Sequence, residues 1–147
     1  MSGSADAGIV DVPVTKVWEQ LNSDARSVLI DVRTRAEWNY VGIPDLSGVG
    51  KKPILMEWQS FPDGTVDTAF AERLAAVLEA EHVGKDAELF FICRSGVRSK
   101  AAAQAMTKAG YMRCRNVADG FEGPLDPARQ RSRLAGWKAA GLAWAQG

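Results

Sequence analysis

The sequence contains little cysteine and little histidine. Its 147 residues include two cysteines, Cys93 and Cys114, and one histidine, His82. Two cysteines are too few for a disulfide framework in a chain of this size, and this scarcity is typical of proteins in a reducing compartment. We therefore expect a cytoplasmic protein, and we predict neither a cofactor nor a bound metal.

The sequence also lacks an excess of charge of either sign and any long hydrophobic run. Eighteen basic residues balance eighteen acidic ones, so we expect no nucleic-acid or membrane-surface partner. No apolar run approaches the roughly 18 to 20 residues that cross a bilayer. Residues 1–8 are small and polar without a signal-peptide pattern, and we predict a flexible N-terminus there. The remaining residues, 9–147, have the length of a single domain.

Short β-branched runs alternate with helical patterns along the chain. Candidate strands cover residues 9–12, 28–30, 53–58, 88–92 and 114–117. Candidate helices cover residues 14–21, a short helix 34–37 with a capping box, a helix that follows Asp67 as its N-cap, residues from Arg98 or Ser99 to 109, and residues 133–142. This alternation predicts an α/β fold with a mainly parallel sheet and helices on both faces.

The segment 90–99 (Phe-Phe-Ile-Cys-Arg-Ser-Gly-Val-Arg-Ser) is predicted to pass from a strand through a tight loop into a helix. Parallel sheets bind ligands beyond the carboxyl ends of their strands, where Cys93 lies. A loop that curls into a helix N-terminus directs backbone N–H groups inward, and Gly96 allows that curvature. With the charges of Arg94 and Arg98, this loop favours the nucleophilic thiolate and predicts a reactive cysteine facing an anionic substrate.

The two cysteines receive different interpretations. Most cysteines are buried core residues, and Cys114, at the start of a predicted strand, fits that role. The same role is the alternative for Cys93. However, the polar residues that follow Cys93 favour a functional role for its thiol.

Four motifs, taken in order, resemble those of rhodanese-like single-domain sulfurtransferases. The loop at 93–99 is similar to the family's active-site pattern, and residues 29–33 (Leu-Ile-Asp-Val-Arg) with Glu37 and Trp38 resemble its upstream motif. Residues 116–121 resemble the strand and glycine turn after the active-site helix, and residues 136–142 resemble the closing element. The resemblance as a whole covers almost the entire chain, from about Val12 to Trp144.

The resemblance implies a parallel five-stranded sheet flanked by helices, and the activity of a thiosulfate sulfurtransferase. Cys93 would take a sulfur atom from thiosulfate or another sulfane-sulfur donor and pass it, from a persulfide, to cyanide or a thiol acceptor. The anion would be bound by the loop residues Arg94, Ser95, Gly96, Val97, Arg98 and Ser99. Asp31, Arg33 and Glu37 would form a supporting structural cluster near this loop.

Two features depart from the family pattern. Many relatives carry a histidine in a Gly-His-Ile-Pro-Gly-Ala stretch, whereas this chain reads Val-Gly-Ile-Pro-Asp at 41–45. His82, which we expect on the surface, cannot replace it, but an ionised thiol needs no general base. The connections 47–65 and 124–135 are longer than usual. They either shape the access of the acceptor or are solvated loops.

Other functions on a related fold differ in ways that the sequence can address. Cysteine-dependent phosphatases and arsenate reductases place five residues between the cysteine and the arginine, whereas four separate Cys93 from Arg98. This spacing favours sulfur transfer. Regulatory rhodanese-like modules usually lack the cysteine, which is present here. A sulfur relay that delivers to an acceptor protein stays open.

Overall fold

A five-stranded parallel sheet forms the centre of the protein. The structure, a computed structural model, describes residues 8–146, so the predicted flexible segment 1–8 lies outside the described residues except for Gly8. The sheet consists of β1 (Val10–Val12), β6 (Arg113–Val117), β5 (Glu88–Ile92), β2 (Val28–Asp31) and β4 (Ile54–Leu55), in that spatial order. Every neighbouring pair is parallel, which confirms the predicted α/β fold.

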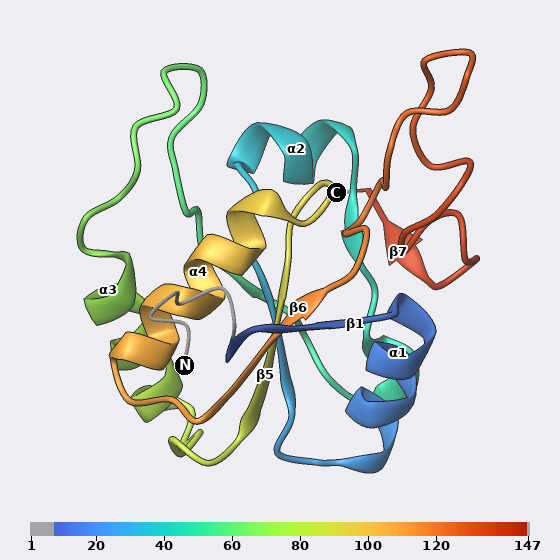
Figure 1. Ribbon diagram of the computed structural model, residues 1–147. Coiled ribbons are helices and arrows are strands. Elements are labelled where there is room, and N and C mark those ends of the chain that lie inside the picture. Colours follow the sequence, from blue (N-terminus) through green and yellow to red (C-terminus); the bar gives the residue numbers. More distant parts are fainter. Residues whose placement is uncertain (1–7, 147) are drawn as a thin grey trace.

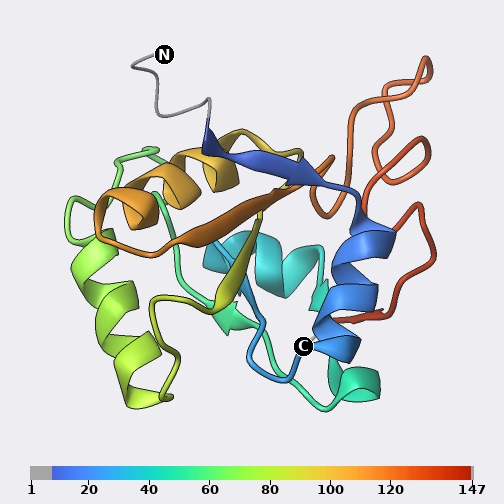
Figure 2. The same cartoon turned by 60° about the horizontal axis from the view of Figure 1, so that its bottom comes forward.

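Helices cover both faces of this sheet, as Figures 1 and 2 show. Helix α1 (Val14–Ser23) packs on one face, and α3 (Phe70–Ala80) and α4 (Val97–Lys108) pack on the other. The short helix α2 (Arg35–Tyr40) lies at the top in Figure 1, beyond the carboxyl ends of the strands. This end of the sheet is where parallel sheets bind ligands.

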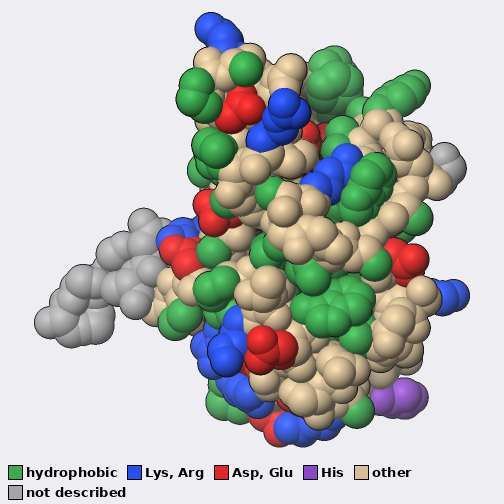
Figure 3. Space-filling model, turned by 90° about the vertical axis from the view of Figure 1, so that its right-hand side faces the viewer, with side chains coloured by type: hydrophobic (Ala, Val, Ile, Leu, Met, Phe, Trp, Pro, Cys, Tyr) green, Lys and Arg blue, Asp and Glu red, His purple; other side chains and the backbone are tan. Residues whose placement is uncertain are grey.

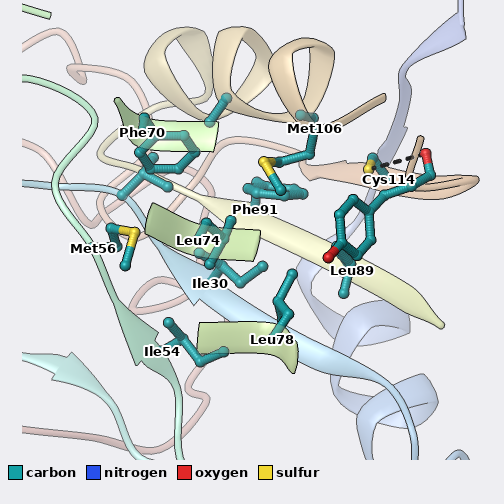
Figure 4. Packing of buried hydrophobic residues seen from close by; sticks show 14 of the residues in the cluster. Ile30, Ile54, Met56, Phe70, Leu74, Leu78, Leu89, Phe91, Met106 and Cys114 are labelled. Carbon is teal, nitrogen blue, oxygen red and sulfur yellow. Dashed lines mark hydrogen bonds between the residues drawn. The ribbon is translucent and has the colours of Figure 1, made fainter. Parts of the chain in front are cut away.

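The core is divided between the two faces because neighbouring side chains of a strand point in opposite directions. Leu89 and Phe91 of β5 pack toward α3 and α4, together with Phe70, Leu74 and Met106 (Figure 4). Phe90 and Ile92 of the same strand pack toward α1, with Val17, Leu21 and the fully buried Trp137. All five residues of β5 are buried, so the strand that precedes Cys93 is held from both sides.

The predicted helix at 133–142 is wrong. This segment forms successive turns, and it leads into strand β7 (Trp144–Ala145), which pairs antiparallel with β3 (Ile43–Pro44). Gly136 and Gly141 adopt positive φ angles of 101° and 77°, which no right-handed helix contains.

Two other element boundaries differ from the prediction. Ala69 occupies the N-cap position of α3, while the Asp67 carboxylate accepts the Ala69 N–H within the preceding turn. The predicted strand 53–58 is reduced to β4, although the N–H groups of Met56 and Trp58 still donate to carbonyls at the end of β2 and beyond it. By contrast, Thr34 caps α2 with the predicted capping box.

The surface of the described residues carries charges of both signs. On the face that carries α1 and β7, acidic and basic side chains lie among hydrophobic ones (Figure 3). A 3-10 helix, η2 (Ser47–Val49), begins the long connection that leads to β4. Within residues 8–146 we find no helix with the length and apolar character that a membrane span requires.

Candidate functional site

Cys93 directly follows β5, the central strand of the sheet, with β6 and β2 on either side. The chain then turns through residues 94–96 into α4, whose N-cap is Gly96. Gly96 has a φ of 118°, a conformation that a residue with a side chain rarely adopts. Helix α4 starts at Val97, slightly earlier than predicted, so that Arg98 and Ser99 lie in its first turn.

The Cys93 sulfur is enclosed by its own loop. The residue is 1% exposed, and the Gly96 N–H donates a hydrogen bond to Sγ at 3.2 Å. The hydroxyl oxygen of Ser99, also buried, lies 3.2 Å from Sγ on another side. A sulfur in such surroundings is shielded from bulk water.

Ser99 is oriented by Asn116 of β6. Asn116 belongs to the motif at residues 116–121, but it was not predicted as part of the site. The Asn116 amide nitrogen donates to the Asp11 carboxylate at 2.8 Å and to the Gly96 carbonyl at 3.2 Å. Its oxygen therefore faces Ser99, whose hydroxyl lies within donating distance of the Asn116 oxygen, at 2.5 Å, and of the Cys93 sulfur, at 3.2 Å. Asn116 thus fixes the position of the hydroxyl that lies against the Cys93 sulfur.

Asn116 is a polar residue whose side chain is buried, which its position between Arg115 and Val117 does not reveal in the sequence. It is 3% exposed, and Val117 beside it is fully buried. Asp11, at its other end, has a pKa below the ordinary value, because Asn116 donates to it and Lys100 forms an ion pair with it, despite the opposing effect of burial. The hydrogen-bonded chain thus extends from the sulfur to a surface carboxylate.

Arg98 forms a two-pronged ion pair with Glu37 of α2. The Arg98 nitrogens donate to the Glu37 oxygens at 2.7 Å and 2.9 Å. Burial by itself would raise the pKa of Glu37, but the bonds and charge of Arg98, together with Thr34, lower it to about 2. Glu37 was expected to cluster with Asp31 and Arg33, and its partner is instead the loop arginine.

Asp31 and Arg33 form the predicted structural pair. Both side chains are fully buried, and the Arg33 Nη2 to Asp31 Oδ2 distance is 2.7 Å. Arg33 also donates to the Gly42 carbonyl and lies 4.2 Å from the centre of the Phe121 ring. Because the Phe121 N–H donates to the Cys93 carbonyl at 2.8 Å, this cluster holds the backbone behind Cys93.

Gly120 lets the chain after β6 approach the loop closely. A Cβ atom at this position would lie 2.4 Å from the Cys93 carbonyl oxygen and 2.7 Å from the Arg94 carbonyl carbon. Real side chains do not tolerate such distances, so the position requires glycine. The predicted glycine turn after the last sheet strand therefore acts as a close backbone support for the loop.

A cleft of about 560 Å³ opens beside the loop arginines, on the β2 side of Cys93. Its lining combines α2 with parts of both long connections: Thr34, Ala36, Glu37, Tyr40, Val41, Gln59, Ser60, Phe61, Pro62, Gly64, Arg94, Arg98, Glu122 and Arg131. In Figure 1 these two connections rise on either side of α2. The long connections therefore border the access to the loop, which favours a role in shaping that access over a role as solvated loops.

The remaining predicted residues lie apart from this site or at its edge. Ser95 and Val97 line a second cleft, of about 530 Å³, toward β1 and β6, and Val97 is exposed. His82 is on the surface at the end of α3, as predicted. Cys114 is buried, and burial raises the pKa of its thiol. Within residues 8–146, no three His, Cys, Asp or Glu side chains come together as a metal site would require.

Comparison with known proteins assigns the family. A family model described as the STR4 middle domain matches residues 10–147. The chain belongs to this family. An uncharacterized Rickettsia conorii protein, RC0915, is 38% identical over 130 residues, which cover 88% of this chain and 92% of that protein. The chloroplastic rhodanese-like domain-containing protein 4 of Arabidopsis thaliana is 23% identical over 127 residues, 86% of this chain and 24% of the longer protein.

Solved structures show the same rhodanese-like fold. The Rv0390 protein of Mycobacterium tuberculosis has a TM-score of 0.82 and 42% identity, over 93% of this chain and 97% of the other. A polysulfide-sulfur transferase homodimer from Wolinella succinogenes has a TM-score of 0.60 and 17% identity, over 97% and 82%. A Rhodopseudomonas palustris protein described as a possible tyrosine phosphatase has a TM-score of 0.58 and 18% identity, over 96% and 88%.

Proposed function

We propose that this STR4 middle-domain protein is a sulfurtransferase that carries a sulfane sulfur as a persulfide on Cys93. The observation that carries the proposal is the position of Sγ, at the carboxyl end of β5 and bonded to the Gly96 N–H at 3.2 Å. The charge of Arg98 lies close enough to interact with that of Cys93. Such a loop stabilises negative charge on sulfur.

Thiosulfate is the donor that we propose for the first step. The Cys93 thiolate attacks the outer sulfur of thiosulfate, so that a new S–S bond forms, the S–S bond within thiosulfate breaks, and sulfite leaves with its electron pair. The Cys93 persulfide then carries the negative charge within the loop. In the second step, cyanide or a thiol attacks the outer sulfur, which lies about 2 Å beyond Sγ in a persulfide.

Phosphate-ester hydrolysis is the alternative function, because the Rhodopseudomonas palustris protein is described as a possible tyrosine phosphatase. At 18% identity, the similarity to that protein shows the fold only. Four residues separate Cys93 from Arg98, one fewer than in the phosphatase pattern. This shorter spacing supports a persulfide rather than a phosphoenzyme. Delivery of the sulfur to an acceptor protein is compatible with the same first step.

Mass spectrometry tests the first step directly. Incubation with thiosulfate should add about 32 Da, the mass of one sulfur atom, to the wild-type protein. Cys93→Ser should abolish this addition, whereas the matched variant Cys114→Ser should retain it, because Cys114 pairs with Leu89 near the start of β5 and the loop follows the end of that strand. An unmodified wild-type protein would refute the thiosulfate assignment, and hydrolysis of para-nitrophenyl phosphate that depends on Cys93 would support the phosphatase instead.

A further inference from the structure

The cleft beside the loop is larger than the ions of the proposed reaction require. Its volume of about 560 Å³ falls within the range of roughly 300 to 1,000 Å³ that is typical of sites for organic ligands. Thiosulfate and cyanide consist of a few heavy atoms each, and either would fill a small part of this space. The cleft therefore has room for an organic molecule, and its lining decides which kind.

The lining of the cleft carries more positive than negative charge, with three arginines against two glutamates. Glu37 pairs with Arg98, but neither Arg94 nor Arg131 forms an ion pair with any of the described residues. One nitrogen of Arg131 donates to the Gly123 carbonyl at 2.8 Å, which anchors the guanidinium. Its other N–H groups stay available to a ligand.

Two exposed aromatic side chains complete the lining. Tyr40 is 82% exposed and Phe61 is 68% exposed, and they belong to α2 and to the first long connection. Aromatic rings of this kind offer apolar contact to the carbon skeleton of an organic molecule. Guanidinium groups bind carboxylates through paired, charge-assisted hydrogen bonds.

We propose that the acceptor of the Cys93 sulfur is an organic thiol that carries a carboxylate, and that Arg131 is the residue that selects it. This inference rests on the proposed sulfurtransferase function. The acceptor thiol attacks the outer persulfide sulfur, a new S–S bond forms, and the bond to Sγ breaks. The thiol proton passes to the product persulfide and Cys93 leaves as a thiolate, so the step needs no other oxidant or reductant. The carboxylate binds at Arg131 and takes no part in bond making.

The test compares two acceptors of similar size, mercaptosuccinate, which has two carboxylates, and thioglycerol, which has none. Arg131→Gln should lower kcat/KM for mercaptosuccinate about tenfold through KM, and should leave thioglycerol within twofold. Arg131→Lys should recover part of the loss. Arg129→Gln removes a charge from the same connection, outside the cleft lining, and should change neither acceptor.

A loss that is equal for both acceptors, or no loss for either, would overturn the role of Arg131. Calorimetric titration of mercaptosuccinate into Cys93→Ser, with and without Arg131→Gln, measures binding without chemistry. If the wild-type protein gains no sulfur from any donor, the proposed function fails, but the calorimetry still tests whether Arg131 binds the carboxylate. Equal affinity of mercaptosuccinate for Cys93→Ser and for the double variant with Arg131→Gln would refute the role of Arg131.

Discussion

The ion pair between Glu37 and Arg98 allows a quantitative prediction. The pKa of Glu37 is about 2 instead of its ordinary value of 4.5. At about 1.36 kcal/mol per pKa unit, this difference corresponds to roughly 3 kcal/mol of stabilisation. Solvent screening reduces this value only slightly, because the side chains of Arg98 and Glu37 are only 19% and 21% exposed. Glu37→Gln should therefore lower the free energy of unfolding by about 3 kcal/mol at neutral pH.

The direction in which this stabilisation changes with pH follows from the two pKa values of Glu37. The pKa of Glu37 is lower in the folded protein than in the unfolded chain, so the stabilisation is complete above pH 4.5. It is lost as the pH falls toward 2, because the unfolded chain binds the proton first. With these two pKa values, about 2 kcal/mol should have been lost by pH 3. The gap between wild type and Glu37→Gln should thus narrow from about 3 to about 1 kcal/mol.

Urea unfolding at pH 6 and pH 3 measures both gaps. Other carboxylates contribute equally to the wild type and to the variant, so their titration cancels in the difference. Glu79→Gln, at an exposed position of α3, is the matched control and should change the free energy of unfolding at pH 6 by less than about 0.5 kcal/mol. A gap for Glu37→Gln that stays constant between the two pH values would refute the assignment of the stabilisation to this pair.

Further predictions concern the backbone support and the hydrogen bonds of the loop. Gly120→Ala should unfold the protein or displace the loop, with a cost of several kcal/mol, because its Cβ would meet the Cys93 carbonyl at 2.4 Å. Gly50→Ala, with a similar φ and open space, should cost only about 1 kcal/mol in thermal unfolding, and equal costs would contradict the steric argument. Asn116→Leu removes the acceptor of the Ser99 hydroxyl and one donor to the Asp11 carboxylate, and it should lower the free energy of unfolding by about 1 to 3 kcal/mol in urea. A cost below about 0.5 kcal/mol would contradict the role of Asn116 as the support of this hydrogen-bonded chain.

The strand, loop and helix around Cys93 could be predicted because their signals are local. Residues 89–92 form a continuous apolar run. Gly96 follows in a tight turn, which requires the positive φ angle that glycine adopts readily. The capping box of Thr34 and Glu37 also lies within a single helical turn. Alternating strands and helices were likewise sufficient for the parallel sheet, since parallel strands need crossover connections.

The partners of these residues were decided by the tertiary structure. Glu37 contributes to the predicted capping box, but its ion pair with Arg98 joins residues 61 positions apart, and the Ser99 to Asn116 bond crosses from α4 to β6. Arg131 belongs to a connection without regular structure, and no local pattern places it at the cleft. Residues 133–142 were predicted to form a helix, but Gly136 and Gly141 adopt positive φ angles. The resulting turns place Trp137 in the core, where it is fully buried. Local signals thus determined where the sulfur lies, whereas the packing of distant segments decided what surrounds it.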